Sequence, residues 1–239
     1  MSRVVEGPKA DASEIFIKKL DDVIARYWLL KHPYYRAWSE GRLSRESLAE
    51  YSKQYYGHVR NFPVYLSAVH SRCEDIEVRR LLLENLMDEE HGEENHPELW
   101  RRFAEGLGVA RDEIESAPLL PRTEESIDTL RSLTTSDNYL RGVAALYAFE
   151  SQVPEVARSK REGLKDFYRI EDEKTVSYFS VHEEADIVHR RQEREILRGR
   201  ARDDASRREV LEAAESSARA MWTFLDGVYE AYAETGTGC

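Results

Sequence analysis

The segment Tyr178-Phe-Ser-Val-His182-Glu-Glu-Ala-Asp186-Ile-Val-His189 contains neither Pro nor Gly, and its pattern is typical of an α-helix. His182, Asp186 and His189 occupy positions i, i+4 and i+7, so a helix presents all three from one stripe. Tyr178 lies one turn before His182 and adds a phenol to the same face. A solvated stripe explains these polar residues equally well, because 34% of the chain is charged. The segment alone therefore predicts a helix and leaves its function open.

A second group of candidate ligands lies in Asp88-Glu89-Glu90-His91-Gly92-Glu93-Glu94-Asn95-His96-Pro97. Glu89 and His96 are two helical turns apart, which is roughly 10 Å along an ideal helix. Pro97 cannot donate a helical hydrogen bond, so we expect the helix to kink or restart there and shorten that distance. Glu90 and His91 compete with Glu89 for the ligand role. The alternative interpretation is an acidic solvated face with a helix break.

A third candidate, Glu150, ends the run Arg141-Gly-Val-Ala-Ala-Leu-Tyr-Ala-Phe-Glu150, in which nearly every residue is apolar or small. Such a helix is buried almost all round, and a carboxylate there is costly unless it is paired or bound to a metal. The alternative is a Glu at the exposed end of the helix, shortly before Pro154. Three carboxylates and three imidazoles in three segments form the donor set of an oxygen-activating dinuclear iron or manganese site.

The rest of the chain predicts an all-α bundle of about seven helices. Its 239 residues, of which 41% are hydrophobic, are enough for one substantial core. No alternating apolar and polar runs bounded by turn signals occur, so we expect almost no strand. We expect one domain over residues 13–232, between a flexible leader (1–12) and a flexible tail (233–239). Helices are predicted from Ser13, as N-cap, to about Tyr27 and over about 45–70, 75–90, 98–106, 124–133, 137–150, 174–197 and 205–229, with the longest loop at 117–123.

Charge and cysteine content limit the partners. The formal net charge is −11, and the arginines between residues 190 and 202 are mixed with acidic residues, so we expect no binding to nucleic acid. Cys73 and Cys239 lie far apart in the sequence, which favours a reduced, cytoplasmic protein, with Cys73 as a small buried thiol. The sequence has no secretory leader and no apolar run that could cross a membrane, so no membrane contact is expected.

Longer stretches around the same candidates carry a resemblance to a known family. They are Tyr55-Tyr56 through Phe62-Pro63-Val-Tyr-Leu-Ser-Ala-Val-His70-Ser-Arg-Cys73, Leu81-Leu-Leu-Glu-Asn-Leu-Met-Asp-Glu89-Glu-His-Gly with Asn95-His96, Gly142-Val-Ala-Ala-Leu-Tyr-Ala-Phe-Glu150-Ser-Gln-Val-Pro, and His182-Glu-Glu-Ala-Asp186. From about residue 14 to residue 228, the chain resembles the chlamydial protein associating with death domains and its bacterial relatives. The resemblance implies a haem-oxygenase-like fold, as in TenA-like and PqqC-like proteins, which holds two metal ions instead of haem. It implies as ligands Glu89, His96, Glu150, His182, Asp186 and His189.

The resemblance also implies an activity. Members of this group supply para-aminobenzoate for folate synthesis, and are thought to cut the aromatic ring from one of their own tyrosines with oxygen and an external reductant. By position, that tyrosine is Tyr35 and the lysine implicated as amino donor is Lys160. Tyr51 and Tyr178 match other tyrosines near the family's site. The metals implied are two irons or one iron and one manganese. Phe149 replaces a tyrosine of the family, which argues against a radical role for a phenol there but not against metal binding.

Two other functions stay open, and each predicts a different outcome. A dimetal oxidase acting on a free amino acid or fatty acid predicts many turnovers per chain and no damage to the protein. A protein-binding scaffold predicts a function that survives the loss of His182. The self-sacrificing reaction predicts that the chain loses mass at Tyr35. A homodimer is compatible with the fold, and the sequence names no protein partner.

Overall fold

The computed structural model describes residues 11–233, in which eleven α-helices and one short 3-10 helix occur and no strand is found. The all-α prediction is therefore confirmed, whereas the expected number of about seven helices is too low. Residues 1–10 and 234–239, most of the predicted leader and tail, lie outside the described residues. The elements are α1 (Ala12–Ala25), η1 (Leu29–Lys31), α2 (Pro33–Ser39), α3 (Arg45–Arg72), α4 (Ile76–Glu90), α5 (His96–Gly106), α6 (Arg111–Ser116), α7 (Pro121–Thr134), α8 (Tyr139–Glu150), α9 (Val153–Tyr168), α10 (Glu173–Arg200) and α11 (Asp204–Tyr232).

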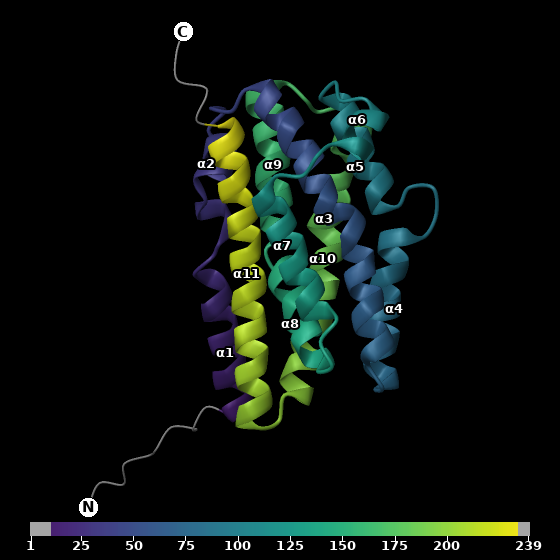
Figure 1. Ribbon diagram of the computed structural model, residues 1–239, viewed down its shortest axis with the longest axis vertical. Coiled ribbons are helices and arrows are strands. Elements are labelled where there is room, and N and C mark those ends of the chain that lie inside the picture. Colours follow the sequence, from purple (N-terminus) through teal and green to yellow (C-terminus); the bar gives the residue numbers. More distant parts are fainter. Residues whose placement is uncertain (1–10, 234–239) are drawn as a thin grey trace, which may run out of the picture.

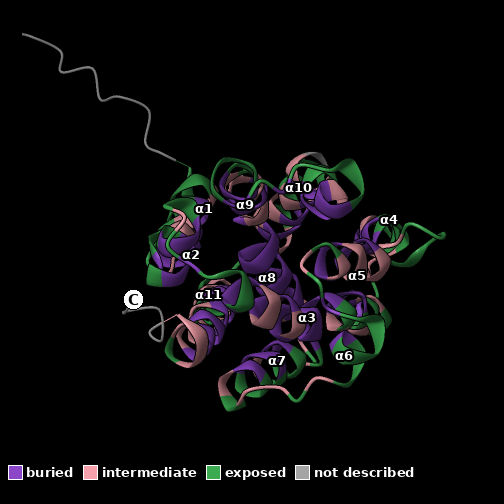
Figure 2. Cartoon of the chain, turned by 90° about the horizontal axis from the view of Figure 1, so that it is seen from above, coloured by how far each residue is buried: buried purple, intermediate pink, exposed green. Residues whose placement is uncertain are grey.

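Most of the long helices run along the long axis of the molecule (Figure 1), and α8 lies at the centre of the bundle when it is viewed from above (Figure 2). The composition of α8 explains this position, because every residue from Gly142 to Glu150 is buried. Gly142 allows a close approach to α3, since a Cβ atom there would lie 2.5 Å from Cγ2 of Val69. The central helix thus ends in the interior, where it presents Glu150.

Proline explains why the predicted number of helices was too low. Pro33, Pro97, Pro121 and Pro154 each occupy the first or second position of a helix, where no intrahelical N–H bond is needed. The sequence interpretation ended a helix at Glu150, shortly before Pro154, and predicted no helix between residues 151 and 173, so it missed α9, which carries Lys160. It likewise missed α2, which begins at Pro33, and it also missed the short α6, which contains no proline. Pro121 lies in the predicted loop 117–123 but begins α7, so that only Ala117–Leu120 connect α6 to α7.

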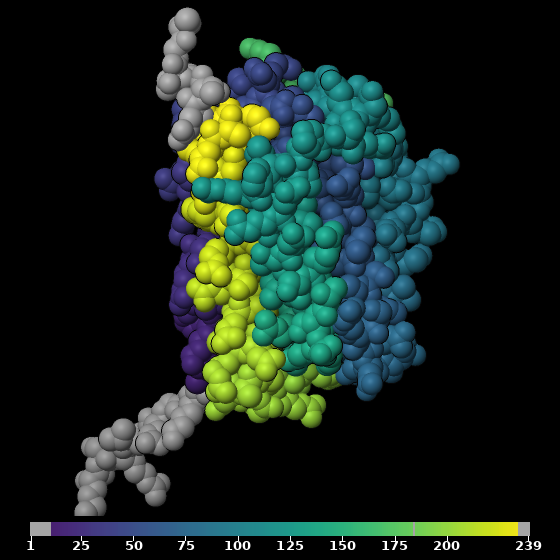
Figure 3. Space-filling model, viewed as in Figure 1, coloured from purple at the N-terminus to yellow at the C-terminus, as the bar shows by residue number. Residues whose placement is uncertain are grey.

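Helix caps set the ends of the elements that carry candidate residues. Ser44 caps α3, and its hydroxyl accepts a hydrogen bond from the Ser47 amide. The predicted cap at Ser13 is wrong, because Asp11 caps α1 and accepts from the Ser13 amide. On the side shown in Figure 3, the surfaces of α11, α7 and α4 close over the interior. Among the described helices, none combines the length and the apolar character needed to cross a membrane.

Candidate metal centre

The six candidate ligands come together in the interior as two groups of three. In each group, one potential ligand atom per residue lies within 4.8 Å of the others, and all six side chains are buried. Helix α10 contributes to both groups. The first group consists of Glu89 from α4, His96 from α5 and His182 from α10; the second consists of Glu150 from α8 with Asp186 and His189 from α10.

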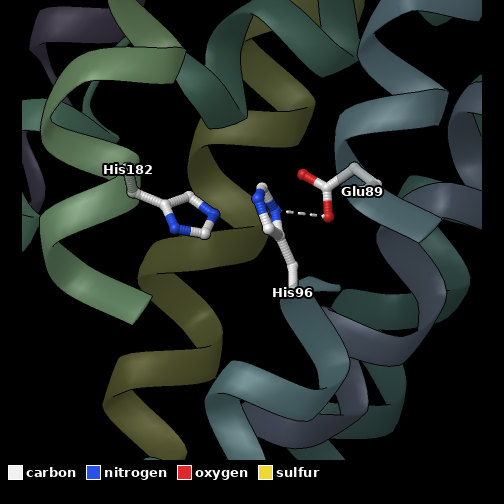
Figure 4. Close-up of side chains that lie close together, drawn as sticks. All are labelled: Glu89, His96 and His182. Carbon is white, nitrogen blue, oxygen red and sulfur yellow. Dashed lines mark ion pairs between the residues drawn. The ribbon is translucent and has the colours of Figure 1, made fainter. Parts of the chain in front are cut away.

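The first group forms because the chain restarts its helix between Glu89 and His96. Helix α4 ends at Glu90, Gly92 adopts a positive φ of 88°, and the side chain of Asn95 caps α5. The restart brings Nδ1 of His96 to 2.9 Å from Oε2 of Glu89 (Figure 4). His182 faces them from α10, with its ring centroid 4.3 Å from that of His96. The competing residues Glu90 and His91 are exposed and take no part in this group.

The second group surrounds the end of the central helix. Nδ1 of His189 lies 3.4 Å from Oε1 of Glu150 and 3.6 Å from Oδ1 of Asp186. Nδ2 of Asn85, on α4, donates to Oε1 of Glu150 at 3.0 Å and fixes the orientation of that carboxylate. The alternative of an exposed Glu150 is excluded, because only 2% of the residue is accessible.

Hydrogen bonds on the outer side of two histidines determine which nitrogen faces inwards. Nδ1 of His182 donates to the carbonyl oxygen of Tyr178 at 2.7 Å, so Nε2 remains available to a metal ion. Nε2 of His189 donates to Oδ2 of Asp88 at 3.0 Å, which leaves Nδ1 towards the carboxylates. Nothing in the acidic run 88–94 distinguishes Asp88 by sequence, so this supporting residue was missed.

Several buried polar atoms in these groups have no hydrogen-bond partner among the residues that the structure describes. They are Nδ1 of His96, Oε2 of Glu150, both carboxylate oxygens of Asp186 and Nδ1 of His189. Nδ1 of His96 lies close to Oε2 of Glu89 but forms no hydrogen bond with it. Each unpartnered buried atom costs roughly 1–3 kcal/mol, and cations would satisfy all of them. Imidazole nitrogens mixed with carboxylate oxygens suit iron and manganese, so the residues present fit a pair of such ions.

The electrostatics of the two groups agree with cation binding. Burial raises the pKa of Glu89 to about 8 and lowers the pKa of His96 to about 4. Burial likewise raises the pKa of Asp186 to about 6. Burial acts to lower the pKa of His189, but the Asp186 and Glu150 side chains outweigh it and raise that pKa to about 11. Protons therefore occupy part of this cluster when no metal is bound, and metal binding must release them.

Tyr35, Tyr51 and Lys160 form a separate buried cluster. Nζ of Lys160 donates to the Tyr51 hydroxyl at 2.5 Å, and that hydroxyl lies 2.8 Å from the Tyr35 hydroxyl. Nζ also lies 4.5 Å from the centroid of the Tyr35 ring. Burial lowers the pKa of Lys160 well below its usual range, which favours an uncharged amine with a free electron pair.

Two small cavities place this cluster next to the two groups of candidate ligands. One, of about 20 Å³, is lined by Tyr35 and Lys160. The other, of about 10 Å³, is lined by Glu89 and His182 together with Glu150 and Asp186. The residues that line both cavities are Tyr55, Phe149, Val153 and Tyr178. Tyr178 also lies against the first group, with its ring centroid 4.0 Å from that of His182.

Two further residues of the site were missed by the sequence interpretation. Tyr55 lines both cavities, and burial, followed by the Asp186 and Glu89 carboxylates, raises its pKa. Nothing in the sequence separates it from the other tyrosines, of which the chain has 13 in all. Glu193 is also buried, one helical turn beyond His189 on α10. Its spacing continues the stripe of candidate ligands, so helical periodicity was a signal that could have found it.

Comparisons with known proteins agree with this geometry. Residues 49–222 match the family described as iron-containing redox enzymes. The chain is 42% identical to the "4-aminobenzoate synthase" of Chlamydia muridarum over 220 residues, which cover 92% of each protein. It is 42% identical to the protein of the same name from Nitrosomonas europaea, over 92% of this chain and 94% of the relative.

Solved structures show the same fold. A domain with a haem-oxygenase-like fold from Shewanella denitrificans superposes with a TM-score of 0.78 over 97% of both chains, at 17% identity. A CADD-like protein from Nostoc punctiforme superposes with a TM-score of 0.71 over 92% of this chain and 98% of the other, at 16% identity. The expected haem-oxygenase-like fold and the resemblance to the chlamydial group are confirmed. The chain is an oxidoreductase that belongs to the family of iron-containing redox enzymes.

Proposed function

We propose that this chain is a dinuclear-metal, oxygen-dependent oxygenase that makes 4-aminobenzoate from its own Tyr35, with Lys160 as the amino donor. The observation that carries the proposal is the common wall of the two cavities, which puts Tyr35 and Lys160 beside the candidate ligands. The relatives that share 42% identity and are named 4-aminobenzoate synthases support the choice of product.

The atoms of the product match these two side chains. 4-Aminobenzoate contains a six-carbon ring with one further carbon, as do the ring and Cβ of tyrosine. The Cα–Cβ bond of Tyr35 would break, Cβ would be oxidised to the carboxyl carbon, and Cα would remain in the chain as that of a glycine residue. The Cε–Nζ bond of Lys160 would also break, leaving Cε as an aldehyde, and the nitrogen would replace the phenolic oxygen, which leaves as water. Oxygen is the oxidant, and an external reductant supplies the remaining electrons. A bound pair of redox-active ions, iron with iron or iron with manganese, would supply the chemistry that activates oxygen.

The protein's own residues would orient the two donors and exclude water. The buried amine of Lys160 is held by the Tyr51 hydroxyl, which also holds the phenol of Tyr35. Nε1 of Trp38 donates to the backbone carbonyl of Lys160 at 3.1 Å and links α2 to α9. Apolar walls formed by residues such as Phe149 and Phe179 would keep bulk water away from reactive species.

The size of the cavities favours an internal substrate over an external one. A volume of about 20 Å³ beside Tyr35 and about 10 Å³ beside the ligands holds one or two water-sized molecules. Dioxygen would fit, whereas a free amino acid or fatty acid would require the walls to move. We therefore rank the oxidase with an external substrate below the oxygenase that consumes its own tyrosine.

Isotope labelling decides between the two functions. The chain is produced with ring-labelled tyrosine and nitrogen-labelled lysine, loaded with iron(II) and manganese(II), and exposed to oxygen with a reductant and unlabelled free amino acids. We expect doubly labelled 4-aminobenzoate, no more than one molecule per chain, and a loss of mass localised to Tyr35. The Tyr35→Phe variant should give no product. Tyr34→Phe is the matched control, because Tyr34 is equally buried but its hydroxyl binds the backbone of Ser47.

Unlabelled product, or many turnovers with an unchanged protein mass, would contradict the internal source and support the oxidase. Product from the Tyr35→Phe variant, with loss of mass at another tyrosine, would keep the reaction but reject Tyr35.

A further inference from the structure

Glu193 is a fully buried acidic residue that the proposed reaction leaves without a role. Only 3% of the residue is exposed, and no donor within residues 11–233 forms a hydrogen bond to either carboxylate oxygen. An ionised carboxylate in that position is strongly unfavourable without a partner of opposite charge. The three arginines nearest to Glu193 in the sequence do not provide one, because Arg190 binds Glu155, Arg194 binds Asp21 and Arg191 is exposed.

The position of Glu193 directs it towards the second group of candidate ligands. On α10 it follows His189 by one turn and Asp186 by about two turns, on the same stripe of the helix. Its carboxylate lies within hydrogen-bonding reach of Glu150. Burial, followed by this neighbouring carboxylate, raises the pKa of Glu193 well above its usual range. Three carboxylates thus lie at one end of the site, where His189 is the imidazole of the second group of candidate ligands.

We propose that Glu193 is a fourth carboxylate of the metal centre and binds, as a further oxygen ligand, the ion held by Glu150, Asp186 and His189. Two divalent ions bring four positive charges into the interior. Glu89, Glu150 and Asp186 balance three of them, and Glu193 balances the fourth. Charge neutrality is what a buried cluster of ions requires.

This assignment makes the two halves of the centre chemically different. The half around Glu89 has one carboxylate and two imidazoles. The half around Glu150 then has three carboxylates and one imidazole, which is an oxygen-rich set suited to a harder ion. The inference rests on the metal centre of the proposed function and is independent of its product.

Cobalt(II) is a suitable probe because its visible absorption reports its ligands. The apo-protein is titrated with cobalt(II) without oxygen, followed by calorimetry and absorption, for the wild type, Glu193→Gln and Glu193→Asp. The matched control is Glu195→Gln, since Glu195 is on the same helix but exposed. We expect Glu193→Gln to bind one of the two ions at least about tenfold more weakly, with a changed absorption band for that ion. Glu193→Asp keeps the charge and should recover part of the affinity.

Thermal unfolding gives a second readout, in which the substitution should raise the stability of the apo-protein but lower the stabilisation by metal. Without metal, Glu193→Gln should unfold at a higher temperature than the wild type, by at least about 2 °C, because a buried acidic group is removed. With cobalt(II), the stabilisation by metal should be smaller than in the wild type. The proposal would be overturned if Glu193→Gln bound both ions with the affinity and the absorption of the wild type, whatever the unfolding temperature of the apo-protein. A wild type that binds two ions but makes no 4-aminobenzoate would refute the proposed function and leave this assignment standing.

Discussion

The amine nitrogen of Lys160 lies 2.5 Å from the hydroxyl oxygen of Tyr51, and both residues are buried. Aromatic rings surround the amine, and the pKa of Lys160 is lowered by burial alone. A structural role explains this arrangement poorly, since an apolar residue of the same length would fill the space at lower cost. Buried lysines with lowered pKa values are instead typical of reactive amines.

We predict that Lys160→Met makes the protein more stable and abolishes the proposed reaction. Methionine has a similar length and needs no desolvation, so the free energy of unfolding should rise. Production of 4-aminobenzoate should fall by at least about tenfold, while bound metal per chain is unchanged. Thermal unfolding, metal analysis and product assays check these three results. Lys165→Met, at an exposed position on the same helix, is the control. Wild-type yield from Lys160→Met would reject Lys160 as the donor.

Asp88→Asn should weaken metal binding although Asp88 is not a candidate ligand. The carboxylate of Asp88 accepts from Nε2 of His189 and orients its ring. Loss of such outer partners typically lowers metal affinity by about 10–100-fold. Titration of the apo-protein with cobalt(II) measures the effect, and Glu90→Gln, an exposed neighbour, is the control. Equal affinities for both variants would show that His189 needs no support from Asp88.

Gly163→Ala should separate the two helices that hold the proposed reactants. A Cβ atom at Gly163 would lie 2.9 Å from Cδ1 and 3.1 Å from the carbonyl oxygen of Trp38. The resulting overpacking should cost about 1–3 kcal/mol, of which the better helix propensity of Ala recovers up to about 1 kcal/mol. Because α9 carries Lys160 and α2 carries Tyr35, product yield should fall more than metal content. Urea unfolding and product assays test this. Gly199→Ala is the control, since no atom lies within 4 Å of a Cβ atom there.

His58 should make the protein less stable as the pH falls. Burial lowers the pKa of His58 from 6.5 to about 3 in the folded chain, so the unfolded chain binds the proton more strongly. The free energy of unfolding should therefore decrease from pH 6 towards pH 4, with a contribution of about 1.4 kcal/mol per pH unit from this group. Urea unfolding of the wild type and of His58→Phe over this pH range isolates the contribution of His58. The buried carboxyl groups are present in both proteins, so their effect on the pH dependence cancels in the comparison. Parallel pH profiles would contradict the prediction.

Local periodicity predicted the parts of the site that lie on one element. His182, Asp186 and His189 share a stripe because helix geometry fixes their relation, whatever surrounds them. The sequence does not reveal that His182 belongs to one group and the other two to the second. That division depends on where α4, α5 and α8 pack against α10, which is a property of the tertiary structure.

Prolines account for two of the three α-helices that the sequence interpretation missed, α2 and α9. Pro97 predicted a break between Glu89 and His96, and the break is real, but its form depends on the turn at Gly92 and the cap at Asn95. The predicted helix ended at Glu150, and no helix was predicted to begin near Pro154, although Pro154 lies in the first turn of α9. A proline can follow the end of one helix or lie in the first turn of the next, and only the packing of the following residues distinguishes these two roles.

The complete burial of Tyr35 has a consequence for the lifetime of the protein. If the side chain is consumed as proposed, a chain that has reacted contains a void of the size of a phenol in its core. Voids left by large aromatic side chains cost about 3–5 kcal/mol, which is a substantial part of the roughly 5–15 kcal/mol that keeps a typical domain folded. Spent chains would therefore unfold more often than fresh ones and be preferred by cellular proteases. The reaction would mark each used molecule for removal, and the pool of folded protein would remain enriched in copies that still carry their tyrosine.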